Sequence, residues 1–280
     1  MPEELSNITD SNPDAQELYG DEAERQKRFN GYSYEDFREE LIKSNAYVRK
    51  INPALHDFDG EGVTVGGESL HGFIIDHQPP EQKDKESLLK YMLETAQKLD
   101  NIQDVALLVG AGITQIHPFI DGNGRTSRLL YANLSAGTDF FKKNEDEILE
   151  GRSSIELGSI IPNKFLIEIA KQRLPQDADD TQISAEACRV LCDAFLSPDE
   201  YVVFPKDVPQ SPRLAKALEG GMPLRDYLVM ASHNLISSYL AEDKDFVIQE
   251  GGGYIVRQKE DHPWKEDTRF GQNKDPDPDN

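Results

Sequence analysis

Apolar positions recur with helical spacing through the middle of the chain. In segment 85–99, leucines and a methionine fall on one face, which predicts an amphipathic helix. Segment 102–116 is apolar on nearly all sides, which predicts a largely buried central helix. Its two glycines, Gly110 and Gly112, each cost about 1 kcal/mol relative to alanine in a helix interior. We therefore expect close packing against neighbouring helices to override their low propensity.

Weaker patterns of the same kind predict further helices. Segment 34–50 would turn its apolar residues toward a core: Phe37, Leu41 and Ala46. Another helix would run from Arg125 to about Ala136, where Gly137 is a suitable stop. The remaining helices are expected at 163–173, at 184–196 with Ser184 as N-cap, and at 223–242.

Two places have the composition of β-hairpins. In segment 63–76, two short β-type runs flank Gly66 and Gly67, and the pattern stops before Pro79 and Pro80. A second hairpin would pair residues 246–248 with 254–256 across three glycines. Mostly helical content with one or two small hairpins gives a mainly α fold.

Polar and acidic composition marks the ends of the chain. Residues 1–33 are expected to be a flexible arm and residues 258–280 a disordered tail, because neither has enough apolar residues to form a core. Residues 51–62 form a loop, residues 144–150 form an acidic surface stretch, and residues 176–257 form a mainly helical region of unassigned function.

The net charge of the chain disfavours some classes of function. The 280 residues contain 52 acidic and 30 basic side chains, a net charge of −22. Such a chain is a poor general binder of nucleic acid or of an anionic membrane surface. No apolar run reaches the ~18 residues of a transmembrane helix, and no apolar leader is present, so we expect a cytoplasmic protein. Cys188 and Cys192 are expected to be buried apolar residues.

The segment 117–128, HPFIDGNGRTSR, concentrates groups suited to phosphate chemistry. Gly122, Asn123 and Gly124 stand just before a predicted helix, where exposed backbone N–H groups and the helix dipole would cradle an anion. Arg125 and Arg128 follow on one side of the first turn, and guanidinium groups bind phosphate oxygens bidentately.

Two other residues of this segment supply different chemistry. Asp121 is a carboxylate next to the expected polyphosphate, which makes it a candidate Mg²⁺ ligand. His117 is the group able to accept a proton near neutral pH. Each of these residues alone is more often structural, but together they indicate transfer from a nucleotide to a hydroxyl group.

The same segment resembles the signature of the Fic (Fido) family, H-x-F-x-[D/E]-G-N-G-R-x-x-R, at every specified position. The resemblance covers roughly residues 35–175, which gives a Fic domain expected at 34–175. It implies a helical bundle with a small β-hairpin called the flap. It also implies transfer of AMP from Mg-ATP to a Ser, Thr or Tyr hydroxyl of a target protein.

The resemblance further implies a role for each matching residue. His117 would take the hydroxyl proton, and Asp121 would hold Mg²⁺. The backbone of the glycine-rich turn, helped by the Asn123 side chain, would cradle the α- and β-phosphates. Arg125 would contact the β- or γ-phosphate and Arg128 the γ-phosphate. Phe119 would anchor the loop in the core, whereas Thr126 and Ser127 receive no role.

Other features of the Fic family are matched only in part by this sequence. The target would dock by strand addition on a flap near residues 63–76. The Doc kinase branch carries Lys where this chain has Gly124, which disfavours a kinase. The inhibitory pattern [S/T]-x-x-x-E-[G/N] is nearly matched at 238–243, but Asp243 stands at its last position. Gly110 stands where related chains often have a histidine.

Three alternatives stay open at this point. The first keeps the fold but uses another phosphate-containing donor or removes AMP. The second is a catalytically silent Fic fold that acts as an interaction module, although the intact His117, Asp121 and Arg128 speak against silence. In the third, residues 176–280 supply the main function as a protein-interaction region.

Overall fold

A computed structural model describes residues 22–55, 57–60, 65–68, 73–149, 163–207, 216, 218–232 and 254–256. Within these residues the fold is mainly helical with small antiparallel sheets, as the sequence predicts. No helix among them is both long and apolar enough to cross a membrane.

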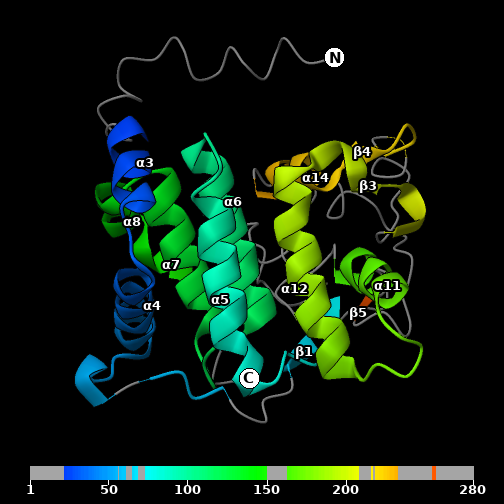
Figure 1. Ribbon diagram of the computed structural model, residues 1–280. Helices are drawn as coiled ribbons and strands as arrows, with labels where there is room; N and C mark the ends of the chain where they lie inside the picture. The colour runs from blue at the N-terminus through cyan, green and yellow to red at the C-terminus, as the bar shows by residue number, and fades with distance from the viewer. Residues whose placement is uncertain are drawn as a thin grey trace, which may run out of the picture.

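Two central helices separate the other helices into two groups (Figure 1). The central pair is α5 (Gln82–Ala96) and α6 (Ile102–Ile116). One group consists of α3 (Glu22–Asn30), α4 (Tyr34–Arg49), α7 (Asn123–Ser135), α8 (Thr138–Lys143) and α9 (Glu145–Leu149). The other group consists of α11 (Asn163–Arg173), α12 (Asp180–Leu196) and α14 (Leu224–Ser232).

Helix α6 is the buried centre of this arrangement, as its apolar sequence predicts. Its residues Val105, Leu108 and Ile113 are fully buried. A Cβ atom added at Gly112 would stand 2.2 Å from Met92 Sδ of α5, so a glycine is needed for this approach. Gly110 accepts a hydrogen bond of 2.6 Å from Ser127 Oγ, which joins α6 to α7. The expected role in close helix contact is confirmed for Gly112, and for Gly110 it stays a prediction.

The N-terminal arm expected at 1–33 is wrong for the described part of that range. Helix α3 packs on the body, with Phe29 buried and its ring against those of Tyr32 and Phe37. Arg25 donates hydrogen bonds of 2.9 Å to the carbonyls of Leu134 and Ser135 at the C-terminus of α7. The buried Phe29 and the hydrogen bonds of Arg25 therefore hold α3 against the body, although the polar composition of this segment predicts that it is exposed to solvent. Residues 1–21 lie outside the described residues.

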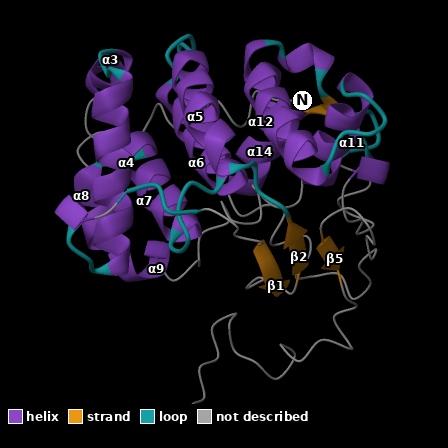
Figure 2. Ribbon diagram, turned by 60° about the horizontal axis from the view of Figure 1, so that its bottom comes forward, coloured by secondary structure: helices purple, strands orange, loops and turns teal. Residues whose placement is uncertain are grey.

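The expected flap hairpin is present, with a different turn (Figure 2). Strand β1 (Val65–Glu68) pairs antiparallel with β2 (Phe73–His77), and Val65 stands opposite His77. Gly66 and Gly67 lie inside β1, not in the turn, because the connection is longer than the two-residue Gly-Gly turn that the pattern predicts. The connecting residues 69–72 lie outside the described residues.

A third strand completes this sheet. Strand β5 (Tyr254–Val256) pairs antiparallel with β2, so that the order is β1-β2-β5. The sequence pattern predicts that residues 254–256 pair with residues 246–248. Residues 246–248 lie outside the described residues. A second, two-stranded sheet pairs β3 (Val202–Val203) with β4 (Met222–Pro223). The predicted tail at 258–280 also lies outside the described residues.

The structure differs from the sequence-based predictions at several helix ends and surface stretches. Helix α12 begins at a capping box of Asp179 and Gln182, so the expectation that Ser184 is the N-cap is wrong. Ser184 is buried and donates its hydroxyl to the Gln78 carbonyl. The predicted acidic surface at 144–150 contains α9, whose Ile148 is buried. Helix α14 covers the first part of the predicted helix 223–242, and residues 233–242 lie outside the described residues.

The apolar core continues through the boundary that the sequence places at 175. On α12, Cys188, Leu191 and Phe195 are buried in the same cluster as residues of α5 and α6. Both cysteines of the chain are free and buried, as expected. Tyr91 of α5 also donates a hydrogen bond of 2.7 Å to Asp193 of α12. Helix α12 therefore belongs to the body that carries the motif.

This shared core predicts a single unfolding transition. Replacing Leu191 with Ala should lower the free energy of unfolding by about 2–5 kcal/mol, because it leaves a cavity in the common core. The matched control is Leu196→Ala, since Leu196 lies on the same helix but is 41% exposed. Calorimetry should show one transition, shifted as a whole by Leu191→Ala. Two transitions, of which only one moved, would show that α12 belongs to a separate domain.

Candidate active site

The motif segment forms the turn between α6 and the N-terminus of α7. His117 is the C-cap of α6 and adopts a left-handed conformation, with φ 53° and ψ 59°. Its N–H donates to the Ile113 carbonyl at 3.0 Å, and the proline that follows cannot continue the helix. The half-buried His117 therefore stands at the point where the chain leaves the central helix.

A buried amide holds this turn together. Asn123 Oδ1 accepts a 3.0 Å hydrogen bond from the Phe119 N–H, and Asn123 Nδ2 donates to the Phe119 carbonyl at 2.6 Å. Phe119 itself is fully buried, which confirms it as the expected anchor. The Asn123 side chain is only 2% exposed and both its polar atoms bond to Phe119, so it holds the turn, and its expected help in binding phosphate stays a prediction.

The N-terminus of α7 lacks a side-chain cap. Its N-cap is Gly122, with φ 81°, a conformation that glycine adopts without strain. A Cβ atom at this position would also stand 3.0 Å from Asn45 Nδ2 and 3.1 Å from Arg49 Cγ. The first N–H groups of a helix have no intrahelical acceptor, so those of Asn123, Gly124 and Arg125 can bind an anion.

The two charged residues at the rim of this cradle pair with each other. Arg125 Nη2 lies 3.1 Å from Asp121 Oδ2, and Arg125 Nη1 donates to the Val48 carbonyl of α4 at 3.0 Å. Asp121 Oδ1 accepts a hydrogen bond of 2.6 Å from the Gly122 N–H. The Asp121 side chain is 65% exposed and that of Arg125 is 37% exposed. Solvent and a ligand can therefore reach both groups.

Arg128 lies deeper than the sequence predicts. It is 7% exposed, and it donates from Nε and Nη2 to the carbonyls of Ile148 and Leu149, at 2.7 and 2.8 Å. Its Nη1 atom is 3.4 Å from the position of a Cβ atom added at Gly124. The guanidinium thus joins the end of α9 to the rim of the cradle, and two of its nitrogens donate to protein carbonyls.

Sequence reasoning missed several residues that support the turn. Asn45 of α4 is fully buried and donates to the Asp121 carbonyl and to Thr126 Oγ1, both at 3.0 Å. Thr126 and Ser127, which received no role, are buried and bond to Asn45 and to the Gly110 carbonyl. The available signal was an asparagine on the apolar face of the predicted helix at 34–50.

A second missed feature is the segment Asp57–Gly60, which lies along the other side of the turn. Asp59 Oδ1 accepts a 2.9 Å hydrogen bond from the Ile120 N–H, and the Gly60 N–H donates to the Pro118 carbonyl at 3.1 Å. The Phe58 and Phe119 rings pack edge to face at 5.4 Å. Lys85 of α5 joins this segment to His117 through two carbonyls.

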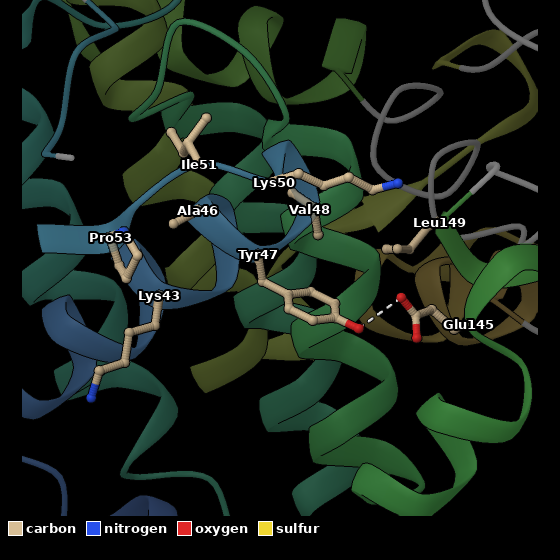
Figure 3. Close-up of a pocket in the computed structure, with 9 residues that line it drawn as sticks. All are labelled: Lys43, Ala46, Tyr47, Val48, Lys50, Ile51, Pro53, Glu145 and Leu149. Carbon is tan, nitrogen blue, oxygen red and sulfur yellow. Dashed lines mark hydrogen bonds between the residues drawn. The ribbon is translucent and has the colours of Figure 1, made fainter. Parts of the chain in front are cut away.

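A surface pocket opens between the end of α4 and α9 (Figure 3). Its volume is about 490 Å³. Val48 and Leu149 line it, and their carbonyls are the ones that bind Arg125 and Arg128. Tyr47 and Glu145 form a hydrogen bond across it at 2.7 Å, which raises the pKa of Tyr47.

The carboxylate of Asp121 fits the expected metal in its chemistry. Mg²⁺ in phosphate-transfer sites usually takes one or two carboxylates, several waters and substrate phosphates. Among the described residues, no cluster of three acidic, histidine or cysteine side chains could form an all-protein metal site. An exposed carboxylate beside an anion cradle is the donor set expected for a cation that arrives with its polyphosphate.

Comparison with known families agrees with this geometry. The model of the Fic/DOC family matches residues 33–135. Residues 33–135 form a Fic domain. The match begins at Ser33, the N-cap of α4, and ends at the last residue of α7. It therefore spans the flap, both central helices and the motif turn, and Fic proteins are generally transferases. No solved structure matches the chain.

The two hydrogen bonds of Asn123 make a prediction about its role. Asn123→Ala should lower the free energy of unfolding by about 1–3 kcal/mol without any nucleotide, because the buried Phe119 N–H and carbonyl lose their partners. Denaturant unfolding measures this change. Asn52→Ala is the control, since Asn52 is an exposed amide that accepts one hydrogen bond from Ala54. Unchanged stability together with weaker ATP binding would show instead that Asn123 is a phosphate ligand.

Proposed function

We propose that the protein is an adenylyltransferase that moves AMP from Mg-ATP to a hydroxyl group of a target protein. The observation that carries this proposal is the uncapped N-terminus of α7, which stands at the far end of the six-residue turn that begins with His117. An anion cradle and a potential general base at the two ends of one rigid turn suit an attack on a phosphate group.

In the proposed reaction, the target hydroxyl oxygen forms a bond to the α-phosphorus of ATP. The bond between this phosphorus and the bridging oxygen breaks, and pyrophosphate leaves. His117 takes the hydroxyl proton as the new bond develops, a contribution typically worth about 10²–10⁴-fold. The N–H groups of Asn123, Gly124 and Arg125 hold the phosphate oxygens, and their fixed orientation costs no rearrangement during the reaction.

The ion pair of Asp121 and Arg125 fits an exchange of partners when Mg-ATP binds. Phosphate oxygens would replace Asp121 as the partner of Arg125, since guanidinium groups bind phosphate bidentately. The released Asp121 carboxylate would then hold Mg²⁺, which neutralises phosphate charge when bound. Nη1 of Arg128, beside Gly124, is the part of that guanidinium nearest to the cradle, and it supports the proposed γ-phosphate contact.

The flap supports a proposed docking site for the target. Strand addition supplies backbone hydrogen bonds without requiring a particular sequence. Strand β2 is paired on both sides, with β1 and with β5, so a target segment would add to the outer edge of β1 or replace β5.

A radiolabelling experiment tests the proposed function. The protein is incubated with Mg²⁺ and ATP labelled at the α-phosphate, with lysate proteins as acceptors, beside a reaction with γ-labelled ATP. His117→Ala should abolish transfer of the α-label and leave Mg-ATP binding largely intact, because His117 takes a proton and binds no phosphate. Transfer of the γ-label alone would identify a kinase. ATP binding without transfer of either label would point to another donor or a silent fold.

The role of Asp121 gives a separate prediction. Asp121→Asn should raise the Mg²⁺ concentration for half-maximal labelling, by about 10-fold or more, because the neutral amide is a weaker ligand for a hard cation. Thermal stability should hardly change, since the ion pair with Arg125 is exposed and worth about 0–1 kcal/mol. The measurement is a Mg²⁺ titration of the initial labelling rate. The matched control is Asp139→Asn, an exposed carboxylate on α8, and equal Mg²⁺ requirements in both variants would contradict the role of Asp121.

A further inference from the structure

A lysine is buried directly beneath the motif turn. Lys85 of α5 is 1% exposed, and its Nζ atom lies 2.6 Å from the Gly60 carbonyl and 2.8 Å from the His117 carbonyl. Lysine is almost never fully buried without partners, because an ammonium group loses its hydration. Burial lowers the pKa of Lys85 to about 8, and the negative charge of Asp59 opposes this shift. The amphipathic pattern of α5 needs only an apolar residue here.

The carbonyl that Lys85 binds belongs to a residue with an unusual backbone. His117 has φ 53°, in the left-handed region that residues other than glycine seldom adopt. Such conformations persist where the surroundings fix them, and they cluster at functional sites. The His117 N–H is held by the Ile113 carbonyl and its carbonyl by Lys85. Both ends of the residue are thus fixed, which sets the direction in which its Cβ, and so its imidazole, leaves the chain.

Gly60 makes this contact possible. A Cβ atom at Gly60 would stand 2.7 Å from the His117 carbonyl oxygen, 2.8 Å from Lys85 Nζ and 2.9 Å from the Pro118 carbonyl oxygen. Two of these three atoms belong to the backbone of the motif turn, so they cannot move without moving the turn. Gly60 and Lys85 therefore approach His117 together, from two segments remote in sequence.

We propose that Lys85 is a positioning residue that works with Gly60 as a clasp on the His117 backbone and holds the imidazole ready to accept a proton. The proposal rests on the proposed function for its kinetic consequence, whereas its structural consequence is independent. The clasp binds no nucleotide and touches no reacting atom. It acts only through the conformation of His117.

The variant Lys85→Met tests this role. Methionine keeps the length and the apolar stem of the side chain but cannot donate to either carbonyl. The maximal labelling rate should fall by about 10- to 100-fold, as expected when a catalytic group is displaced by about 1 Å. The ATP concentration for half-maximal rate should stay within about twofold, because the α7 cradle is untouched. Lys83→Met, on the exposed side of the same helix, is the control.

A double variant with Gly60 distinguishes a positioning role of Lys85 from a general effect on stability. Gly60→Ala should lower the maximal labelling rate as much as Lys85→Met does. The rate of the double variant should be no lower than that of the slower single variant, because the effects of residues that act as a unit are not additive. Additive losses, or a loss of rate accompanied by weaker ATP binding and a large fall in Tm, would overturn the proposal. An unchanged rate in Lys85→Met would overturn it as well.

Amide hydrogen exchange tests whether Lys85 holds the His117 backbone without relying on an activity assay. Lys85→Met should speed amide exchange in peptides that cover 57–60 and 117–122, while peptides from α12 keep the exchange rates of the unmodified protein. Unchanged exchange in the two segments would overturn the clasp, even if the transfer assay works. If the unmodified protein transfers no label, the proposed function fails, but locally faster exchange in Lys85→Met would still support the clasp.

Discussion

The structure depends on one constraint: six residues must carry the chain from the end of α6 to the start of α7 while helix N–H groups stay accessible. The two helices pack closely, and the hydrogen bond from Ser127 to the Gly110 carbonyl fixes them side by side. The turn must therefore be tight, and it uses left-handed conformations at His117 and at Gly122. Those conformations place His117 at one end of the turn and the uncapped N-terminus of α7 at the other, where the proposed function needs a proton acceptor and an anion site.

Such a turn cannot hold its shape alone, and three buried polar side chains hold it, two of them from remote segments. Asn45 binds the Asp121 carbonyl from α4, Asn123 binds the Phe119 main chain from α7, and Lys85 binds the His117 carbonyl from α5. Each side chain satisfies backbone groups that would otherwise be buried without partners. In a low-dielectric interior such networks are rigid, because a single missing partner is costly. Rigidity of this kind is what an anion site and a general base require.

Positively charged groups gather at this turn although the net charge of the chain is −22. The α7 N-terminus supplies partial positive charge, and Arg125 and Arg128 add full charges on the same side of the helix. Backbone carbonyls at the ends of α4 and α9 orient both guanidinium groups. The acidic residues elsewhere do not cancel this local field, because screening in physiological salt limits exposed charges to about 8 Å.

The sequence by itself determined the helical class, the extent of α4 and α6, and the residues of the motif, because helical periodicity and turn chemistry are local properties. It also pointed to Phe119 as an anchor. Only the tertiary structure decided that Asn123 holds the loop, that Arg128 joins α9, and that α3 packs on the body. It alone brought Gly60 and Lys85 to His117. Apart from the local bonds of Asn123, the hydrogen bonds of Arg25, Lys85 and Arg128 join residues 20 to 110 positions apart, and no local pattern encodes which carbonyl a distant side chain will meet.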